Sequence, residues 1–433
     1  MNKKKIAVIG SGISGLSASF FLSKNFEVTL FEKNKYLGGH TRTIKVADDQ
    51  NNYNIDTGFI VFNENNYPLL KNFFDYLSVE TAESDMSFAV SSKFNNIEYG
   101  GKNIFTLFAQ PKNIFSSKFL MLVFDIIKFY NECRSIDLNE EYKKLNIEEF
   151  LNLKKYDNKI RDLHLYPIIS SIWSSNNEDV KKFPLISFIN FFKNHGLFNF
   201  KKRPQWKYVK NGSNTYIKNL INKKLFKYFT NYKIYKVKRN NNKIYILNNK
   251  KEILEFDKIV FATHANEVLD LIEKPTKKEI NILSKFLYTK NTAYLHNDKR
   301  FMPKNLKVWS SWNFIQNTNN AKNFSLSYWM NNLQKLNSTN NYFVTINPFI
   351  EPREIIDRTI FNHPVFNLDT IQAQKKIREI QGEKNTFFCG SYCGYGFHED
   401  GIQSAAFISN MLDTDMPWSQ NNKFYNRLLY NYE

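Results

Sequence analysis

The residues with the clearest chemical meaning are three glycines and an acid near the N-terminus. Gly10, Gly12 and Gly15 have the spacing Gly-x-Gly-x-x-Gly after an apolar run, and Glu32 ends a second apolar run 22 residues past Gly10. Such glycines let a strand turn tightly into a helix and let backbone approach a pyrophosphate, while an acid near this offset accepts hydrogen bonds from a ribose. The pattern predicts a dinucleotide-binding unit. The acid disfavours NADP, because it would repel the 2′-phosphate.

The flanking runs predict the elements that must position these residues. We expect a strand at residues 6–9, a helix from about Ile13 to Ser23, and a strand at 27–31 that ends before Glu32. The N–H groups at the start of that helix would face the phosphates. The motif alone leaves one alternative open, which is a glycine-rich turn in an unrelated α/β protein.

Length and composition bound the classes of function. A chain of 433 residues exceeds one ordinary core, so we expect two lobes. The net charge of +19 fits either a biased composition or a basic surface, and no nucleic-acid-binding signature accompanies it. The three cysteines, Cys133, Cys389 and Cys393, have neither disulfide-framework nor metal spacing. We therefore expect a cytoplasmic protein, with no metal and no nucleic-acid partner.

The order of the patterns along the chain predicts an interleaved organisation. A buried strand at 258–264 and another at 386–390 indicate returns to the nucleotide lobe, whereas residues between them are aromatic and mostly helical in pattern. We expect the nucleotide lobe to comprise residues 1–62, 203–270 and 380–433. The substrate lobe would comprise 63–202 and 271–379.

One stretch, residues 104–133, is apolar nearly all round and carries Lys112, Lys118 and Lys128. Such a pattern is typical of a helix buried in the second lobe. The alternative is a helix that lies in a membrane interface, with lysines near the lipid headgroups. The N-terminal MNKKK superficially resembles a signal peptide, but the following run carries the glycine motif, so we interpret it as the first strand and helix.

The chain resembles the flavin-containing amine oxidases and phytoene-desaturase-like enzymes, and within them a bacterial branch of predicted NAD/FAD-binding proteins. The resemblance runs from the N-terminus to about residue 412. Its most specific segments are DTGFIVFNENNYP at 56–68, SDMSFAVS at 84–91, RPQW at 203–206, WSSWNF at 309–314 and CGSYCGYGFHEDGIQSA at 389–405.

The resemblance implies noncovalent FAD in an α/β fold of the p-hydroxybenzoate-hydroxylase type, with a Rossmann-type FAD-binding lobe and an interleaved α+β substrate lobe. It assigns the pyrophosphate to Gly10, Gly12 and Gly15, the adenosine ribose to Glu32, and the phosphates to Gly38, Gly39 and either His40 or Arg42. It places the backbone of Val237 at the adenine, Gly390 and Ser391 near the ribityl chain, and Asp400, Gly401 and Ile402 at a helix start facing the flavin; an acidic helix cap is the alternative for the last three. The remaining residues expected at the cofactor are Ile13, Ser14, Lys33, Thr41, Thr57, Gly58, Ala262 and Thr263.

Flavin chemistry needs few protein acids or bases, because the cofactor accepts the hydride. His398 and Glu399 are the candidate catalytic residues, since the resemblance places them at the flavin-facing turn. Lys290 lies in the region where many amine oxidases carry a lysine bridged by water to flavin N5, but the sequence offsets it from the strand. Two further candidates have a structural alternative: the aromatic residues Trp309, Trp312, Tyr328 and Trp329 as cavity walls, and Cys393 as a redox group.

Substrate class divides into two hypotheses. Phe outnumbers Trp 40 to 6 and residues 104–133 are rich in both Phe and Lys, which favours an unsaturated fatty-acyl or isoprenoid chain that is desaturated or isomerised. An amine substrate, a monoamine or polyamine, is the alternative, because a cation gains from aromatic faces. A third hypothesis is a flavin- or lipid-binding protein without turnover. On the first hypothesis we expect contact with an anionic membrane at its inner face.

Overall fold

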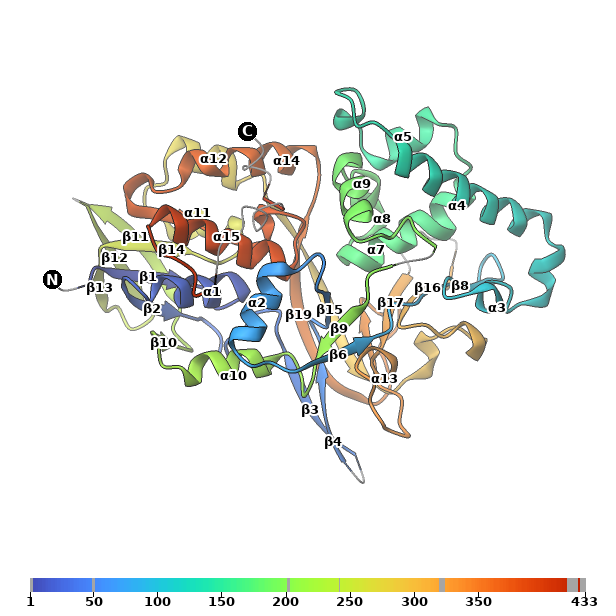
Figure 1. Ribbon diagram of the computed structural model, residues 1–433, viewed down its shortest axis with the longest axis horizontal. Helices are drawn as coiled ribbons and strands as arrows, with labels where there is room; N and C mark the ends of the chain where they lie inside the picture. The colour runs from blue at the N-terminus through green and yellow to red at the C-terminus, as the bar shows by residue number, and fades with distance from the viewer. Residues whose placement is uncertain are drawn as a thin grey trace.

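The computed structural model describes residues 3–48, 51–200, 203–240, 242–318, 324–418 and 427–428. The predicted nucleotide-lobe segment 380–433 therefore includes residues outside the described part of the chain. Figure 1 shows two lobes side by side, one built on a parallel sheet and the other on a larger mixed sheet with helices at its far end.

A five-stranded parallel sheet forms the centre of the first lobe. Its order is β10–β2–β1–β14–β20, with β1 Lys5–Ile9, β2 Glu27–Phe31, β10 Lys227–Phe229, β14 Lys258–Phe261 and β20 Thr386–Phe388. The strands come from all three chain segments predicted for this lobe. Apart from the first residue, β1 is buried on both faces, as expected for a parallel strand covered by helices on both sides.

Two hydrophobic cores cover the faces of this sheet. One is formed with α1 (Ile13–Leu22), α2 (Pro68–Tyr76), α10 (Asn214–Asn222) and α15 (His398–Met411). The other contains the antiparallel β11 (Ile234–Asn240), β12 (Lys243–Asn248) and β13 (Ile253–Phe256), together with α11 (Ala265–Leu271), α12 (Lys277–Leu283) and α14 (Leu368–Lys376). Helices α12 and α14 fall in a segment predicted for the substrate lobe, yet they pack into the nucleotide-lobe core.

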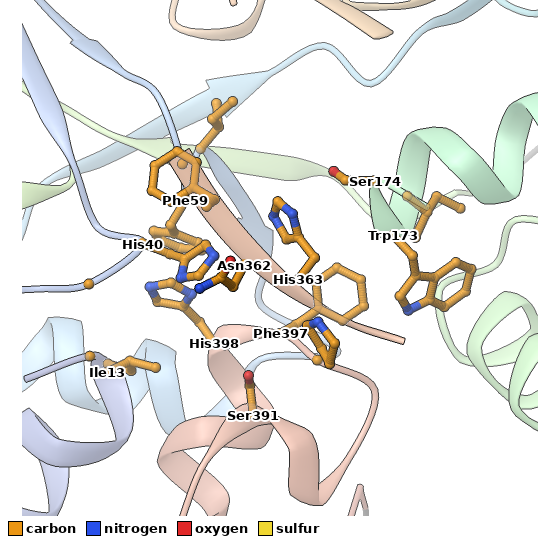
Figure 2. Close-up of a pocket in the computed structure, with 18 of the residues that line it drawn as sticks. Ile13, His40, Phe59, Trp173, Ser174, Asn362, His363, Ser391, Phe397 and His398 are labelled. Atoms are coloured by element: carbon orange, nitrogen blue, oxygen red, sulfur yellow. The ribbon is translucent and has the colours of Figure 1, made fainter. Parts of the chain in front are cut away.

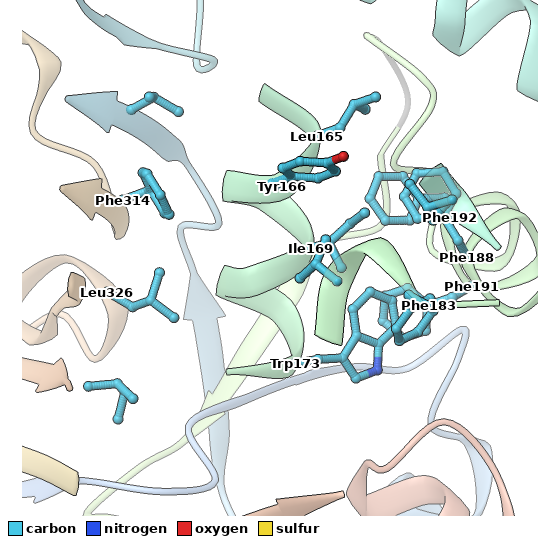
Figure 3. Close-up of a cluster of buried hydrophobic side chains, with 14 of the residues drawn as sticks. Leu165, Tyr166, Ile169, Trp173, Phe183, Phe188, Phe191, Phe192, Phe314 and Leu326 are labelled. Atoms are coloured by element: carbon cyan, nitrogen blue, oxygen red, sulfur yellow. The ribbon is translucent and has the colours of Figure 1, made fainter. Parts of the chain in front are cut away.

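A seven-stranded sheet forms the second lobe. Its order is β19–β15–β18–β17–β16–β7–β8, with β7 Phe88–Ser92, β8 Ile97–Gly100, β15 Leu287–His296, β16 Trp312–Gln316, β17 Phe324–Trp329, β18 Phe343–Ile346 and β19 Ile355–Val365. The helices over it are α3 (Ile104–Leu107), α4 (Ser117–Ser135), α5 (Ile147–Leu153), α6 (Asn158–Ile160), α7 (Tyr166–Trp173), α8 (Asn177–Lys181) and α9 (Leu185–Asn194). Figure 3 shows α7 side chains packed between the sheet residues Phe314 and Leu326 and a cluster of Phe side chains.

Smaller elements connect the lobes. Strands β5 (Val61–Asn63), β9 (Trp206–Val209) and β6 (Thr81–Ser84) form a three-stranded sheet, β3 (Thr43–Asp48) and β4 (Asn51–Asp56) form a hairpin, and α13 (Met330–Leu333) follows β17. The predicted fold class is confirmed. The prediction for residues 104–133 needs correction, because one long helix is replaced by α3, a 3-10 helix η1 (Pro111–Phe115) and α4; the proline at the start of η1 has no N–H to continue α3.

Candidate active site

A single cavity runs from the glycine turn of the first lobe to the aromatic side chains of the second. Its volume is about 390 Å³, within the range of ~300–1,000 Å³ typical of small-molecule sites. The glycine turn and Glu32 line one end, and α7, β16 and β17 line the other. Figure 2 shows His40, Phe59, Asn362, His363 and His398 gathered in its middle, from four separate chain segments.

The turn from β1 into α1 is shaped by lack of side chains. Gly10 has φ +98°, and a Cβ on Gly15 would lie 1.8 Å from the carbonyl oxygen of Gly10, so neither position admits another residue without a shift. Gly12 is the N-cap of α1 and makes no side-chain cap, and a Cβ there would meet no atom of the described residues within 4 Å. Gly12, Ile13 and Ser14 line the cavity, so the uncapped positive end of α1 faces it.

Glu32 closes the same end of the cavity and is only 5% exposed. Its Oε2 accepts from the backbone N of Ser11 at 3.0 Å and from Ser11 Oγ at 2.6 Å, and its Oε1 accepts from the backbone N of Asn34 at 2.9 Å. A carboxylate has about four acceptor sites, so one remains for a ligand hydroxyl. Lys33 also lines the cavity and pairs with Glu267 at 2.7 Å on the surface.

The double glycine and its neighbours separate into two groups. Gly38 and Gly39 line the cavity, as does His40, whose buried Nε2 has no hydrogen-bond partner among the residues that the structure describes. Arg42 does not line it. Its guanidinium instead forms two hydrogen bonds with Asp357, at 2.5 and 2.9 Å. Of the two candidates for the phosphates, the structure therefore places His40 at the cavity and commits Arg42 to β19.

Other predicted cofactor residues also divide. Thr57, Gly58, Ala262, Thr263, Gly390 and Ser391 line the cavity. Val237 does not: it is fully buried in the core of β11, and its carbonyl accepts from the backbone N of Glu273 at 3.0 Å. Val237 forms an isolated parallel bridge with Ile272, which follows α11. Its carbonyl therefore already has a partner and is not free to contact adenine.

The start of α15 brings His398 to the cavity. The helix begins at His398, before the Asp400–Ile402 segment that the resemblance placed at its start. The imidazole stacks on Phe59 with ring centroids 3.7 Å apart, and its Nε2 lies 2.9 Å from Oγ1 of Thr41, which in turn contacts the Tyr216 hydroxyl at 2.6 Å. Burial lowers the pKa of His398 to about 3, so the ring is neutral at pH 7.

The acids of the same segment have other partners, which corrects the catalytic prediction for Glu399. Its carboxylate is buried outside the cavity lining and accepts from the backbone N of Leu69 at 3.1 Å and of Leu70 at 3.0 Å. It thereby caps α2, whose own N-cap residue makes no side-chain cap. Burial raises the pKa of Glu399 to about 7.

The remaining residues of this turn also lie behind the cavity. Asp400 pairs with Arg427 at 2.9 Å, and Ile402 is buried in the core beside α1. A Cβ on Gly401 would lie 2.7 Å from Ile13 Cγ2 and from Ser14 Oγ, so the absence of a side chain lets the first turns of α15 and α1 meet. Asp400, Gly401 and Ile402 therefore position the helix start and do not line the cavity.

Sequence reasoning missed a pair of residues on β19, Asn362 and His363, that line the centre of the cavity. The amide nitrogen of Asn291 donates to the carbonyl of Ser174 at 2.9 Å and lies 2.7 Å from His363 Nδ1. Because an amide nitrogen only donates, His363 Nδ1 accepts and the ring proton is on Nε2. Burial lowers the pKa of His363 to about 4, so this is a neutral donor.

His264 is the other missed imidazole, and it stands near His40 and Tyr288 at the start of α11. Burial lowers the pKa of both His264 and His40. In the described residues, no cluster of His, Cys, Asp and Glu is arranged to hold a metal ion. The histidines thus form a polar but uncharged middle section of the cavity.

The four aromatic candidates divide between the far end of the cavity and ordinary core packing. Trp312 and Tyr328 line it, whereas Trp309 and Trp329 pack against each other outside it. Lys290 lies within β15, and not offset from the strand as the sequence indicated, and its exposed side chain does not line the cavity. The three cysteines are buried, and Cys393 does not line the cavity.

Comparisons with known proteins place this geometry in a fold. Residues 8–77 match the family model of the NAD(P)-binding Rossmann-like domain, and no curated protein sequence matches the chain. Solved structures do match over 95% of it. A protein from Exiguobacterium sp. 255-15 with the name protoporphyrinogen oxidase has 13% identity, 99% of its own length covered and a TM-score of 0.71. The chain has the fold of the flavin amine oxidases.

Two further proteins whose structures have this fold are named for different substrates. The fatty acid isomerase from P. acnes that produces CLA has 14% identity and a TM-score of 0.66, with 95% of this chain and 98% of that chain covered. Putrescine oxidase bound to putrescine has 14% identity and a TM-score of 0.66, with 95% and 99% covered. The flavin amine oxidase fold confirms the family resemblance at the level of fold, and it accommodates both an apolar and an amine substrate.

Proposed function

We propose that this chain is an FAD-dependent oxidoreductase and that FAD occupies the cavity. The residues present fit such a group in three respects. A glycine turn leaves room against the uncapped start of α1, Glu32 keeps an acceptor site, and the buried His40 Nε2 lacks a partner in the described part of the chain. An anionic dinucleotide would satisfy each of these.

The residues of the chain would divide the cofactor between them. The N–H groups of Ile13 and Ser14 would hold the pyrophosphate and Glu32 the adenosine ribose. The start of α15, whose Phe397 and His398 line the cavity, would lie against the ring system, with the carboxylate of Asp400 accepting from the backbone N of Phe397 behind it. FAD, when bound, supplies a two-electron acceptor for a hydride.

The lining of the other end supports our proposal for the substrate class. Side chains of Phe88, Ile172, Trp173 and Trp312 are among the many apolar groups there, and Glu32, at the adenosine end, is the only acid in the described lining. An ammonium substrate would lack a carboxylate partner near the centre. The exposed Arg203 at the edge of the lining could instead pair with a carboxylate headgroup. This lining is the observation that carries the proposal of an unsaturated fatty-acyl or isoprenoid chain, desaturated or isomerised.

The chain's own part in the reaction is positional. The apolar wall would hold the hydrocarbon and exclude water, which protects the hydride transfer from competing protons. His363 offers a fixed Nε2–H donor in the middle of the cavity, and no charged side chain stands beside it in the described lining. The neutral imidazoles therefore add hydrogen bonds without adding a charge that would oppose an apolar chain.

A direct experiment measures flavin content and then reactivity. The purified protein, supplied with FAD, should show a bound-flavin absorbance spectrum. Anaerobic incubation with polyunsaturated fatty acid should reduce the flavin and so bleach its absorbance. For a redox-neutral isomerisation it should instead yield a fatty acid with a shifted double bond, detected by mass spectrometry. Reduction by putrescine or a monoamine instead would establish the amine alternative. No change with either class, while a lipid co-purifies, would favour a non-catalytic flavin- and lipid-binding protein.

A charge reversal tests the headgroup contact. Arg203→Glu removes an exposed cation and adds a repulsive charge, so KM for a fatty acid should rise roughly threefold to tenfold with little change in kcat. Lys210→Glu is the matched control, because Lys210 is a nearby exposed cation that pairs with Glu80 and does not line the cavity. An equal rise in KM for both variants would mean that overall charge, and not Arg203, attracts the substrate.

A further inference from the structure

The second lobe exposes a group of apolar side chains on consecutive elements. Phe105 on α3 is 82% exposed and Phe115 at the end of η1 is 89% exposed, which is unusual for large aromatic residues. Met121 and Phe124 on α4 are 65% and 66% exposed. We call the following residues the apolar patch: Ile104, Phe105, Phe115, Leu120, Met121 and Phe124.

The two faces of helix α4 differ in burial, which explains the patch. Its inner face, with Phe119, Leu122 and Ile126, is buried in the core of the second lobe. Its outer face carries Met121 and Phe124 at a spacing that puts both on one side. Figure 1 shows α3 and α4 at the edge of the molecule farthest from the nucleotide lobe. The outer apolar face thus has no covering element in the described part of the chain.

Three exposed lysines, Lys112, Lys118 and Lys128, lie on the same elements as this patch. Lys112 donates to the carbonyl of Asn96 at 2.7 Å and Lys128 lies over the ring of Tyr156, but none of the three forms an ion pair with a carboxylate among the described residues. The only acid in residues 103–128 is the half-buried Asp125. Large apolar side chains flanked by lysines match the two layers of an anionic bilayer surface, which are acyl chains and phosphate headgroups.

We propose that α3, η1 and the first turns of α4 dock this protein on an anionic lipid bilayer. The side chains of the patch would enter the acyl boundary while the lysines stay among the headgroups. In the described residues, no helix combines the length and hydropathy needed to cross a bilayer, so the contact is one of surface docking. The surface uses no cavity residue, so this inference stands independently of the proposed reaction.

The patch also lies close to the cavity wall. Strand β8 pairs with β7, whose Phe88 lines the cavity, and a Cβ on Gly100 of β8 would lie 3.1 Å from Thr106 Cβ on α3. Only one strand therefore separates the docking elements from the strand that carries Phe88. If the substrate is a lipid, docking would place its source beside the lobe that receives it.

Co-sedimentation of the full-length chain with vesicles tests the proposal. Binding to vesicles of phosphatidylcholine with phosphatidylglycerol should exceed binding to phosphatidylcholine alone. The double variant Phe115→Glu/Phe124→Glu should lose more than about tenfold in partitioning, because each buried Phe strengthens it by roughly that factor. Ile253→Glu is the control, since Ile253 is 68% exposed on β13 in the other lobe.

The lysines are tested in the same assay. Lys118→Glu/Lys128→Glu should weaken binding to anionic vesicles more than Lys236→Glu/Lys238→Glu on β11, and raising salt from about 0.05 M to about 0.5 M should abolish that difference. Equal loss for patch and control variants, or no preference for anionic vesicles in the unmodified protein, would overturn the proposal. So would an unmodified dimer that Phe115→Glu/Phe124→Glu converts to monomers, because a second copy would then cover the patch.

A second measurement guards against misfolding of the variants. Met121→Cys and Ile253→Cys can be labelled with a polarity-sensitive fluorophore, because the three native cysteines are buried. Vesicles should increase the emission of the label at position 121 and leave the label at position 253 unchanged. Unchanged emission at both positions would contradict insertion of the patch, whatever the sedimentation shows.

Discussion

Replacing Glu32 by Gln should weaken FAD binding and the folded state by separate, calculable amounts. The carboxylate accepts from Ser11 N, Ser11 Oγ and Asn34 N through both of its oxygens. A glutamine amide has one oxygen, so its NH₂ must face one of the two backbone N–H groups. One buried donor then lacks an acceptor, which costs about 1–3 kcal/mol in the free energy of unfolding.

The cofactor loses a charge-assisted hydrogen bond as well. Such a bond contributes about 1.5–3 kcal/mol, so the Kd for FAD should rise roughly tenfold to a hundredfold beyond any effect on folding. Titration of apoprotein with FAD, followed by fluorescence, gives the Kd, and urea unfolding of the apoprotein gives the stability. Glu267→Gln is the control, because its exposed pair with Lys33 contributes at most about 1 kcal/mol.

The Kd for FAD and the stability of the apoprotein test the ribose contact and the internal hydrogen bonds of Glu32 separately. A Kd within about threefold of the unmodified value, with reduced stability, would refute the ribose contact and leave Glu32 a purely structural residue. An unchanged stability would refute the hydrogen-bond count around the carboxylate. A loss of FAD affinity as large in Glu267→Gln would show that the charge of this whole end, and not the carboxylate of Glu32, governs binding.

Two further predictions concern buried groups. Glu399→Ala leaves the N–H groups of Leu69 and Leu70 without their acceptor, so the free energy of unfolding should fall by about 2–5 kcal/mol in urea titrations; a fall below about 1 kcal/mol would contradict the capping role. Burial lowers the pKa of His164 and His195 to about 3, and their neutral forms stabilise the fold fully above the unfolded pKa of about 6.5. Stability should therefore fall by about 1 kcal/mol per histidine for each pH unit below 6.5, a slope that His195→Phe should reduce in thermal unfolding from pH 7 to 5.

The part of the site that the sequence predicts is the part built from neighbouring residues. A strand, a glycine turn, a helix and an acid lie within residues 5–32, and each element is required by local geometry. The middle of the cavity is different. His363 meets Asn291 across 72 residues, so no local spacing announces the contact.

Strand β19 shows why local patterns fail there. It contains Asp357, Arg358 and Pro364, and one of its sides is exposed, so its sequence has neither the apolar run of a buried strand nor a clean alternation. Its pairing with β15 defines it as a strand. The catalytic prediction for Glu399 is wrong for a related reason. Its position in the chain suggested a place at the flavin, but its carboxylate caps a helix that starts 331 residues earlier, at Pro68.

The meeting of α1 and α15 at Gly401 makes a position outside the cavity control the shape of the cavity. A Cβ at position 401 would lie 2.7 Å from Ile13 Cγ2 and from Ser14 Oγ, and Ile13 and Ser14 both line the cavity. Any side chain at position 401 would therefore push the first turn of α1 out of place, together with the backbone N–H groups that face the cavity. A substitution there would change ligand binding without touching the ligand.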